Sequence, residues 1–225
     1  MTGDLPPNHH ADHPGFKGVL GYLGAFSMLA GRSGDARLVA DMAHLGTDAP
    51  PAGTVGEPCV LDLGCGPGTA VRMAARLGAN AIGVDPSAPM INTARILTRL
   101  RTPTSSVRWI LGGAEQLELA DESVSVCWSL ASVHHWPDLQ GALSEIRRVL
   151  RPGGSFIALE RLTDPGASGL ASHGWTDDQA HQFAQMMTDH GFSDATVASH
   201  SGRRRRVVTV QGHKQAVNAE RIVTE

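Results

Sequence analysis

Short apolar runs alternate with amphipathic segments through the middle of this chain. The apolar runs, which we interpret as buried strands, are Cys59–Leu63, Ala81–Val84, Val107–Leu111, Val124–Leu130 and Ser155–Glu160. Apolar residues at helical spacing predict helices over residues 70–77, 87–97 and 139–150, and a later helix is expected over 177–190. Repeated alternation of strands and helices predicts an α/β fold with a mostly parallel sheet.

The two ends of the chain depart from this alternation. Residues 15–45 predict one or two helices, and the polar segment Met1–His13 before them is expected to be mobile. Near the other end, Thr196–Ala198 and Val207–Val210 read as paired strands joined by a run of four arginines, Arg203–Arg206. We interpret these arginines as a solvated hairpin end, with an anion site as the alternative.

A linker rich in proline and glycine, residues 48–58, separates the two parts of the chain. We therefore expect a flexible segment and helical lid over residues 1–50, followed by one α/β domain over residues 51–225.

The first predicted strand runs into a glycine loop with the spacing G-x-G-x-G, Gly64–Gly68, and Asp62 stands two residues before it. A dinucleotide loop instead has the spacing G-x-G-x-x-G and aims backbone N–H groups at a pyrophosphate. A carboxylate at the strand end repels a pyrophosphate and suits a cationic ligand. S-adenosylmethionine fits, because it carries an ammonium and a sulfonium and no phosphate. Asp85, which follows the second strand, can accept hydrogen bonds from both ribose hydroxyls.

This loop resembles motif I of the class I S-adenosylmethionine-dependent methyltransferases, and in particular the type 11 methyltransferase domain. The resemblance continues in an adenine loop at Gly112–Leu117, in Ala120–Trp128 and in Val149–Gly154. It implies a Rossmann-like, seven-stranded, mostly parallel sheet with helices on both faces and an N-terminal helical lid. It also implies S-adenosylmethionine as the cofactor and S-adenosylhomocysteine as the product.

The motifs assign a set of cofactor-binding residues. The set is Asp62, Gly64, Cys65, Gly66, Gly68, Asp85, Pro86, Met90, Gly113, Ala114, Glu115, Ser129 and Tyr22. The family usually carries an acid where this chain has Gly113, so we expect the N–H of Ala114 to serve the adenine ring and Glu115 to compensate in part. Tyr22 and Lys17, in the expected lid, are candidates for contact with the methionyl carboxylate; the alternative is that Tyr22 only packs its helix.

Two adjacent histidines, His134 and His135, follow the fourth predicted strand, and Glu160 ends the fifth. A hydroxyl acceptor needs a general base, and histidine titrates near neutrality. Glu160 could hold a histidine ring in one tautomer and stabilise its imidazolium. The set resembles sugar O-methyltransferases of natural-product pathways, which implies that His134 is the base with His135 and Glu160 in support. The alternatives are structural histidines and a salt bridge from Glu160 to an arginine.

Composition mainly excludes other classes of protein. A net charge of −3 attracts neither nucleic acid nor a membrane surface. The apolar stretch over residues 19–30 is too short and too broken by glycine to span a bilayer. Cys59, Cys65 and Cys127 lack metal-ligand spacing and indicate free thiols in a reducing cytosol, and no signal peptide is visible, so we expect a cytoplasmic protein.

The resulting hypothesis is an O-methyltransferase acting on a hydroxyl of a small polar metabolite, a sugar in the first place. One alternative is a quinone- or lipid-biosynthesis C- or O-methyltransferase with an aromatic or hydrophobic acceptor; another is a non-catalytic, cofactor-binding regulator. The expected partner is a small-molecule acceptor and not nucleic acid, and a homodimer is left open. His9, His10 and His13 could hold a metal, but no carboxylate or cysteine cluster accompanies them, so none is expected.

Overall fold

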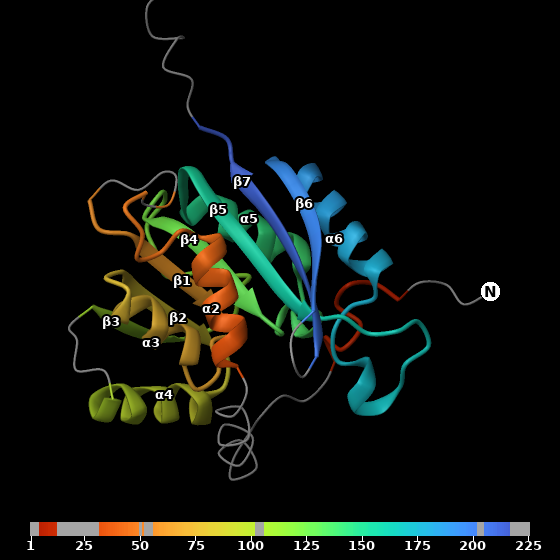
Figure 1. Ribbon diagram of the computed structural model, residues 1–225, viewed down its shortest axis with the longest axis horizontal. Helices are drawn as coiled ribbons and strands as arrows, with labels where there is room; N and C mark the ends of the chain where they lie inside the picture. Colours follow the sequence, from red (N-terminus) through yellow and green to blue (C-terminus); the bar gives the residue numbers. More distant parts are fainter. Residues whose placement is uncertain are drawn as a thin grey trace, which may run out of the picture.

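The computed structural model describes residues 5–12, 32–49, 51, 56–101, 106–201 and 205–216. In these residues seven strands form one sheet in the order β3-β2-β1-β4-β5-β7-β6 (Figure 1). The first five pair in parallel, whereas β7 is antiparallel to both β5 and β6. The predicted α/β class is confirmed, and so is the pairing of the last two predicted strands, which form an antiparallel pair at one edge of the sheet.

The strands are β1 (Cys59–Leu63), β2 (Asn80–Asp85), β3 (Val107–Leu111), β4 (Val124–Leu130), β5 (Leu150–Arg161), β6 (Phe192–Ser201) and β7 (Arg206–Lys214). The α-helices are α2 (Ser33–Met42), α3 (Thr69–Arg76), α4 (Ala88–Arg101), α5 (Leu139–Val149) and α6 (Asp177–Asp189), and two 3₁₀ turns, η1 (Val133–His135) and η2 (Gly169–Ser172), join them. The main difference from prediction is that β5 begins at Leu150, because that residue already pairs with Val124 of β4.

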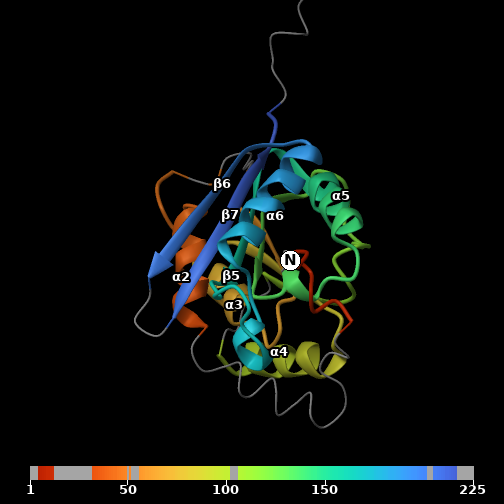
Figure 2. The ribbon, with the colours of Figure 1, turned by 90° about the vertical axis from the view of Figure 1, so that its right-hand side faces the viewer.

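The helices cover both faces of the sheet (Figures 1 and 2). On one face, α2 and α3 pack against β1 and β4 around Val39, Val71 and Trp128. On the other, α5 and α6 pack around Ile146, Phe156 and related side chains. Helix α2 lies within the predicted lid segment, yet its buried face belongs to the core. The division of the chain at residue 50 stays a prediction.

Residues 5–12, which the sequence predicts to be mobile, run across the end of the fold beside α6 (Figure 2). The indole of Trp175 donates to the carbonyl of Pro7 at 2.6 Å, and the amide of Gln179 donates to Leu5 at 3.0 Å. Both donors are buried and need acceptors, which explains why this polar segment is held in place. The rest of the expected lid, including Tyr22 and Lys17, lies outside the described residues.

Two of the four arginines of the C-terminal hairpin lie in described residues and are paired with carboxylates. Arg205 pairs with Asp35 of α2, and Arg206 lies 2.8 Å from Asp164. These pairs connect the hairpin to the body of the domain. None of the described helices has the length and apolar character needed to cross a membrane.

Candidate cofactor and catalytic site

The glycine loop after β1 uses its own N–H groups internally. The N–H groups of Gly64 and Cys65 donate to the carbonyl of Val84, and that of Gly66 donates to the carboxylate of Asp85 at 2.8 Å. The N–H of Gly68 donates to the carbonyl of Cys65. A pyrophosphate loop directs such groups at its ligand, so this arrangement speaks against a dinucleotide.

Close packing explains two of the loop's glycines. A side chain at Gly64 would overlap the hydroxyl of Ser132, and one at Gly68 would overlap the ring of Trp109. Both glycines also have positive φ, at 68° and 79°. The contact with Ser132 places the glycine loop directly beside the loop that follows β4, two residues before His134.

Asp85 ends β2 as predicted and is buried. Its two oxygens accept hydrogen bonds from the N–H groups of Gly66 and Ser87, each at 2.8 Å. A carboxylate oxygen has a second lone pair, so this arrangement fixes the group and still leaves acceptor capacity for ribose hydroxyls. Pro86 follows at the surface, and Met90 is buried in the first turn of α4.

A small pocket adjoins Asp62 at the carboxyl end of β1. It is lined by Arg32, Asp62, Gly64, Cys65, Pro67, Thr69, Ala70 and Leu130. Burial raises the pKa of Asp62 to about 8, against the opposing charge of Arg32. Its Oδ1 atom and the hydroxyl of Ser129, both buried, have no hydrogen-bond partner among the described residues. A buried carboxyl group with one unpartnered oxygen atom fits a site that a cationic ligand completes.

The adenine loop departs from the family pattern in the way that the sequence indicated. The side chain of Glu115 folds back so that its carboxylate lies where the first carbon of a side chain at position 113 would be. Ala114 is buried. The predicted compensation of Gly113 by Glu115 is therefore sterically feasible.

His134 and Glu160 form a buried pair at the carboxyl ends of β4 and β5. The Nδ1 atom of His134 lies 2.8 Å from Oε2 of Glu160, and their side chains are 3% and 0% exposed. The backbone N–H of His134 also points at Oε1, at 3.4 Å. Because a carboxylate accepts, Nδ1 carries the proton and Nε2 carries the lone pair. That Nε2 atom is buried and has no hydrogen-bond partner in the described part of the chain.

More histidines gather around this pair than the sequence suggested. The rings of His135 and His173 have centroids 4.1 Å and 5.7 Å from that of His134, and those of His10 and His9 lie 5.8 Å and 6.3 Å away. Burial, and then the neighbouring His134, lower the pKa of His135 to about 4, so its ring is neutral near pH 7.

Four residues at this site were not predicted from the sequence to belong to it: Arg32, His173, His9 and His10. His173 follows η2, and Arg32 precedes α2, where its guanidinium donates to the carbonyl of Leu130 at 2.6 Å. His9 and His10 were considered only as an isolated N-terminal group. No local motif marks any of them, since each reaches the site through contacts between distant parts of the chain.

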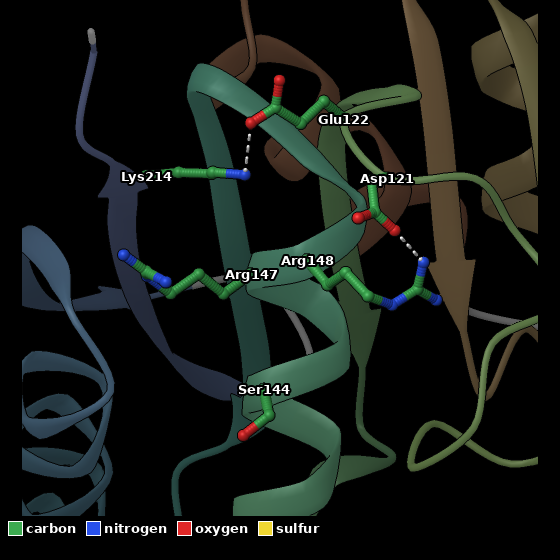
Figure 3. A pocket seen from close by; sticks show the side chains of 6 residues that line it. All are labelled: Asp121, Glu122, Ser144, Arg147, Arg148 and Lys214. Carbon is green, nitrogen blue, oxygen red and sulfur yellow. Dashed lines mark hydrogen bonds and ion pairs between the residues drawn. The ribbon is translucent and has the colours of Figure 1, made fainter.

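A second pocket is lined by Asp121, Glu122, Ser144, Arg147, Arg148 and Lys214 (Figure 3). Asp121 and Glu122 immediately precede β4, and ligands of open α/β sheets bind instead beyond the carboxyl ends of strands. Its charged groups also pair with one another, Arg148 with Asp121 at 2.7 Å and Lys214 with Glu122 at 3.1 Å. We therefore assign neither cofactor nor acceptor to this pocket.

Comparisons with known proteins agree with the cofactor that this site favours. A family model described as a methyltransferase domain matches residues 61–158. The malonyl-[acyl-carrier protein] O-methyltransferase of Pectobacterium atrosepticum is 32% identical over 188 residues, which cover 84% of this chain and 67% of that enzyme. The ubiquinone biosynthesis O-methyltransferase of Agrobacterium fabrum is 31% identical over 146 residues, which cover 62% of this chain and 58% of that enzyme.

Other relatives match over a smaller part. The sterol 24-C-methyltransferase of Pneumocystis carinii is 32% identical over 102 residues, and the match spans 45% of this chain and 27% of that enzyme. The chain thus spans about a quarter of the length of that relative and two thirds of the Pectobacterium enzyme.

Solved structures confirm the fold. The geranyl diphosphate C-methyltransferase of Streptomyces coelicolor A3(2), in complex with S-adenosyl-L-homocysteine, superposes with a TM-score of 0.63 at 19% identity and covers 81% of this chain and 76% of its own. The [4+2]-cyclase SpnF gives a TM-score of 0.67 at 18% identity, and the match covers 82% of this chain and 81% of the cyclase chain.

A fold shared with a cyclase does not by itself define the reaction. The glycine loop, the family model and the relatives at 31–32% identity all indicate a methyltransferase. The chain therefore belongs to the class I S-adenosylmethionine-dependent methyltransferases, and S-adenosylmethionine is its cofactor.

Proposed function

We propose that this enzyme transfers a methyl group to a hydroxyl oxygen of a small-molecule acceptor, with His134 taking up the hydroxyl proton. One observation carries the proposal. His134 is buried at the carboxyl end of the sheet, is held by Glu160, and carries an Nε2 atom without a partner among the described residues. The contact of Gly64 with Ser132 brings the loop that carries His134 to the edge of the cofactor loop.

The chemistry follows from the hydrogen bonds. The bound cofactor supplies an electrophilic methyl group on a sulfonium. Glu160 fixes the Nδ1–H tautomer of His134, so Nε2 is the atom that can accept a proton as the acceptor oxygen attacks. The proton then resides on Nε2, and the buried carboxylate of Glu160 stabilises the imidazolium. Burial of both groups excludes water from this step.

The pocket beside β1 has groups that suit the zwitterionic end of a ligand. Asp62 offers a carboxyl group and Arg32 a guanidinium, and both line the same small pocket. We assign Asp62 to the ammonium and Arg32 to the carboxylate of the methionyl group, since each side chain can carry the charge opposite to that of the group it would bind. Asp85 is assigned to the ribose hydroxyls and the loop from Gly113 to Glu115 to the adenine.

The acceptor class is the finer part of the proposal. Two relatives are named as O-methyltransferases, of malonyl-[acyl-carrier protein] and of ubiquinone biosynthesis, and others as sterol C-methyltransferases. None of the relatives reported above is named for a sugar, so the sugar acceptor rests on the His134, His135 and Glu160 pattern alone. The half-buried imidazoles around His134 favour a polar acceptor over a sterol-like one.

A turnover screen tests the proposal. Purified enzyme with S-adenosylmethionine is offered sugars, phenols, carboxylic acids and olefinic lipids, and products are identified by mass and by the position of the new methyl group. We expect methyl ethers from the hydroxyl-bearing compounds. Methyl esters alone, or methyl groups on carbon alone, would overturn the hydroxyl assignment. A product ether from a sugar but not from a phenol would establish the sugar class.

A further inference from the structure

Three histidines at the site of His134 and Glu160 bring their ring nitrogens close together, an arrangement that methyl transfer does not require. One nitrogen from each of His134, His135 and His173 lies within 4.8 Å of the others. His134 is buried and the other two are half-buried. Three imidazoles converging from two separate loops form a donor set for a transition metal, because imidazole nitrogen is a preferred ligand of Zn²⁺, Ni²⁺ and Cu²⁺.

Two of the three rings are oriented in the manner of metal ligands. Nδ1 of His134 donates to the carboxylate of Glu160 at 2.8 Å, and Nδ1 of His135 donates to the backbone carbonyl of His10 at 3.3 Å. An oxygen acceptor on Nδ1 fixes the tautomer that carries its lone pair on Nε2. Metal-binding histidines in proteins almost always have such a carboxylate or carbonyl partner on the second nitrogen.

The third ring is positioned by the backbone after η2. The N–H of Trp175 donates to the carbonyl of Arg161 at the end of β5, which ties this segment to the sheet. Gly174 has a φ of 142°, and a side chain there would overlap that same carbonyl. The ring of His10 stacks on His173 with a 4.2 Å centroid separation and an angle of 7°. His173 is therefore held toward the cluster from two sides.

We propose that His134, His135 and His173 form a binding site for a divalent transition metal of the zinc type. A tetrahedral ion with Zn–N bonds of about 2.1 Å needs ligand nitrogens about 3.4 Å apart, so the rings must close by roughly 1 Å. Magnesium does not fit, because it prefers oxygen ligands.

The site goes beyond the proposed function and has a consequence for it. The Nε2 lone pair of His134 cannot hold a metal ion and accept the acceptor's proton at the same time. The metal-bound enzyme therefore lacks its base, and saturating Zn²⁺ should slow methyl transfer. Binding itself is measurable without methyl donor or acceptor, so failure of the metal site and failure of the methyl-transfer proposal are separate results.

The test is titration of the tag-free protein with Co²⁺, followed by its visible absorption, and with Zn²⁺, followed by calorimetry. We expect one ion per chain and a Co²⁺ spectrum typical of nitrogen ligation. His173→Gln and His135→Gln should each weaken binding by at least about tenfold, and Glu160→Gln by about 10–100-fold, as for loss of an outer partner of a ligand. The control His181→Gln, on the exposed surface of α6, should bind Co²⁺ as the wild type does.

Thermal unfolding in the presence of a chelator establishes that each variant is folded before it is titrated. Absence of saturable Co²⁺ binding by the wild type would overturn the proposal. So would wild-type affinity in both His173→Gln and His135→Gln, since the ion would then be bound elsewhere. Acceleration of methyl transfer by saturating Zn²⁺ would overturn the competition between the ion and the proton.

Discussion

His134 and Glu160 lie 26 positions apart in the chain, yet Nδ1 of one is 2.8 Å from Oε2 of the other. The sheet brings them together, because β4 and β5 are parallel neighbours and Leu130 pairs with Leu159. Glu160 directly follows Leu159, and His134 follows Leu130 by four positions. Both therefore lie at the carboxyl edge of the sheet, where the cofactor loop also lies. The pair therefore combines a fixed tautomer with burial near the cofactor loop.

Glu160→Gln tests the support that this carboxylate gives to the imidazolium. Glutamine keeps the size of the side chain and can still accept from Nδ1, but it lacks the negative charge. We expect a lower rate of methyl transfer than in the wild type, with a smaller loss than removal of His134 causes, and unchanged affinity for the cofactor. Rate and affinity are measured separately, by single-turnover kinetics and by calorimetry. A rate equal to that of the wild type would show that the charge contributes nothing to the reaction.

Asp85→Ala tests the ribose contact. Hydrogen bonds to a charged acceptor contribute about 1.5–3 kcal/mol each, so affinity for S-adenosylhomocysteine should fall about tenfold or more. The substitution also leaves the N–H groups of Gly66 and Ser87 without their acceptor. Asp85→Asn, which keeps one oxygen, should lose less than Asp85→Ala. Equal calorimetric affinities of wild type and Asp85→Ala would contradict the assignment.

Asp62 gives a prediction about stability and pH. Burial raises its pKa from 3.8 to about 8, so the folded protein keeps a proton that the unfolded chain releases. This contribution to stability is fully present below about pH 4 and is lost as the pH rises to about 8. Denaturant unfolding at pH 5 and pH 8 should therefore show a smaller loss of stability in Asp62→Asn than in the wild type. Parallel losses in the two proteins would contradict the raised pKa.

The same group predicts proton release on cofactor binding. With a pKa of about 8, Asp62 is mostly protonated at pH 7 in the free enzyme. An ammonium beside it favours the carboxylate, so binding should expel a proton. Calorimetry at pH 7 in buffers of different ionisation enthalpy should give different binding heats for the wild type. The difference should be smaller in Asp62→Asn; an identical difference in both proteins would place the ammonium elsewhere.

Local sequence signals were sufficient for the fold and the cofactor loop. Alternation of apolar and polar residues located the strands from Cys59 onward, and the spacing of Gly64, Gly66 and Gly68 distinguished the cofactor from a dinucleotide. These features depend on residues a few positions apart, which is the range over which helices, strands and turns form. The adjacency of His134 and Glu160 also followed once β4 and β5 were taken as neighbours.

Contacts over long sequence separations were not predictable in this way. Arg32 reaches the carbonyl of Leu130 across 98 positions, and His10 reaches Ser172 across 162. Nothing near Arg32 or His10 in the chain indicates these partners. The segment over residues 5–12 looked mobile because it is polar, but buried donors on Trp175 and Gln179 hold it in place.

The most direct test of the account is the single-turnover rate of methyl transfer in His134→Ala, with an acceptor found in the screen and cofactor at saturation. Loss of a general base typically costs about 10²–10⁴-fold in rate. We predict a decrease of that size with nearly unchanged cofactor affinity, because the base acts in the transition state, and a wild-type rate in the surface control His181→Gln. A wild-type rate in His134→Ala, with His135→Ala inactive, would move the base to His135; wild-type rates in both would contradict histidine base catalysis altogether.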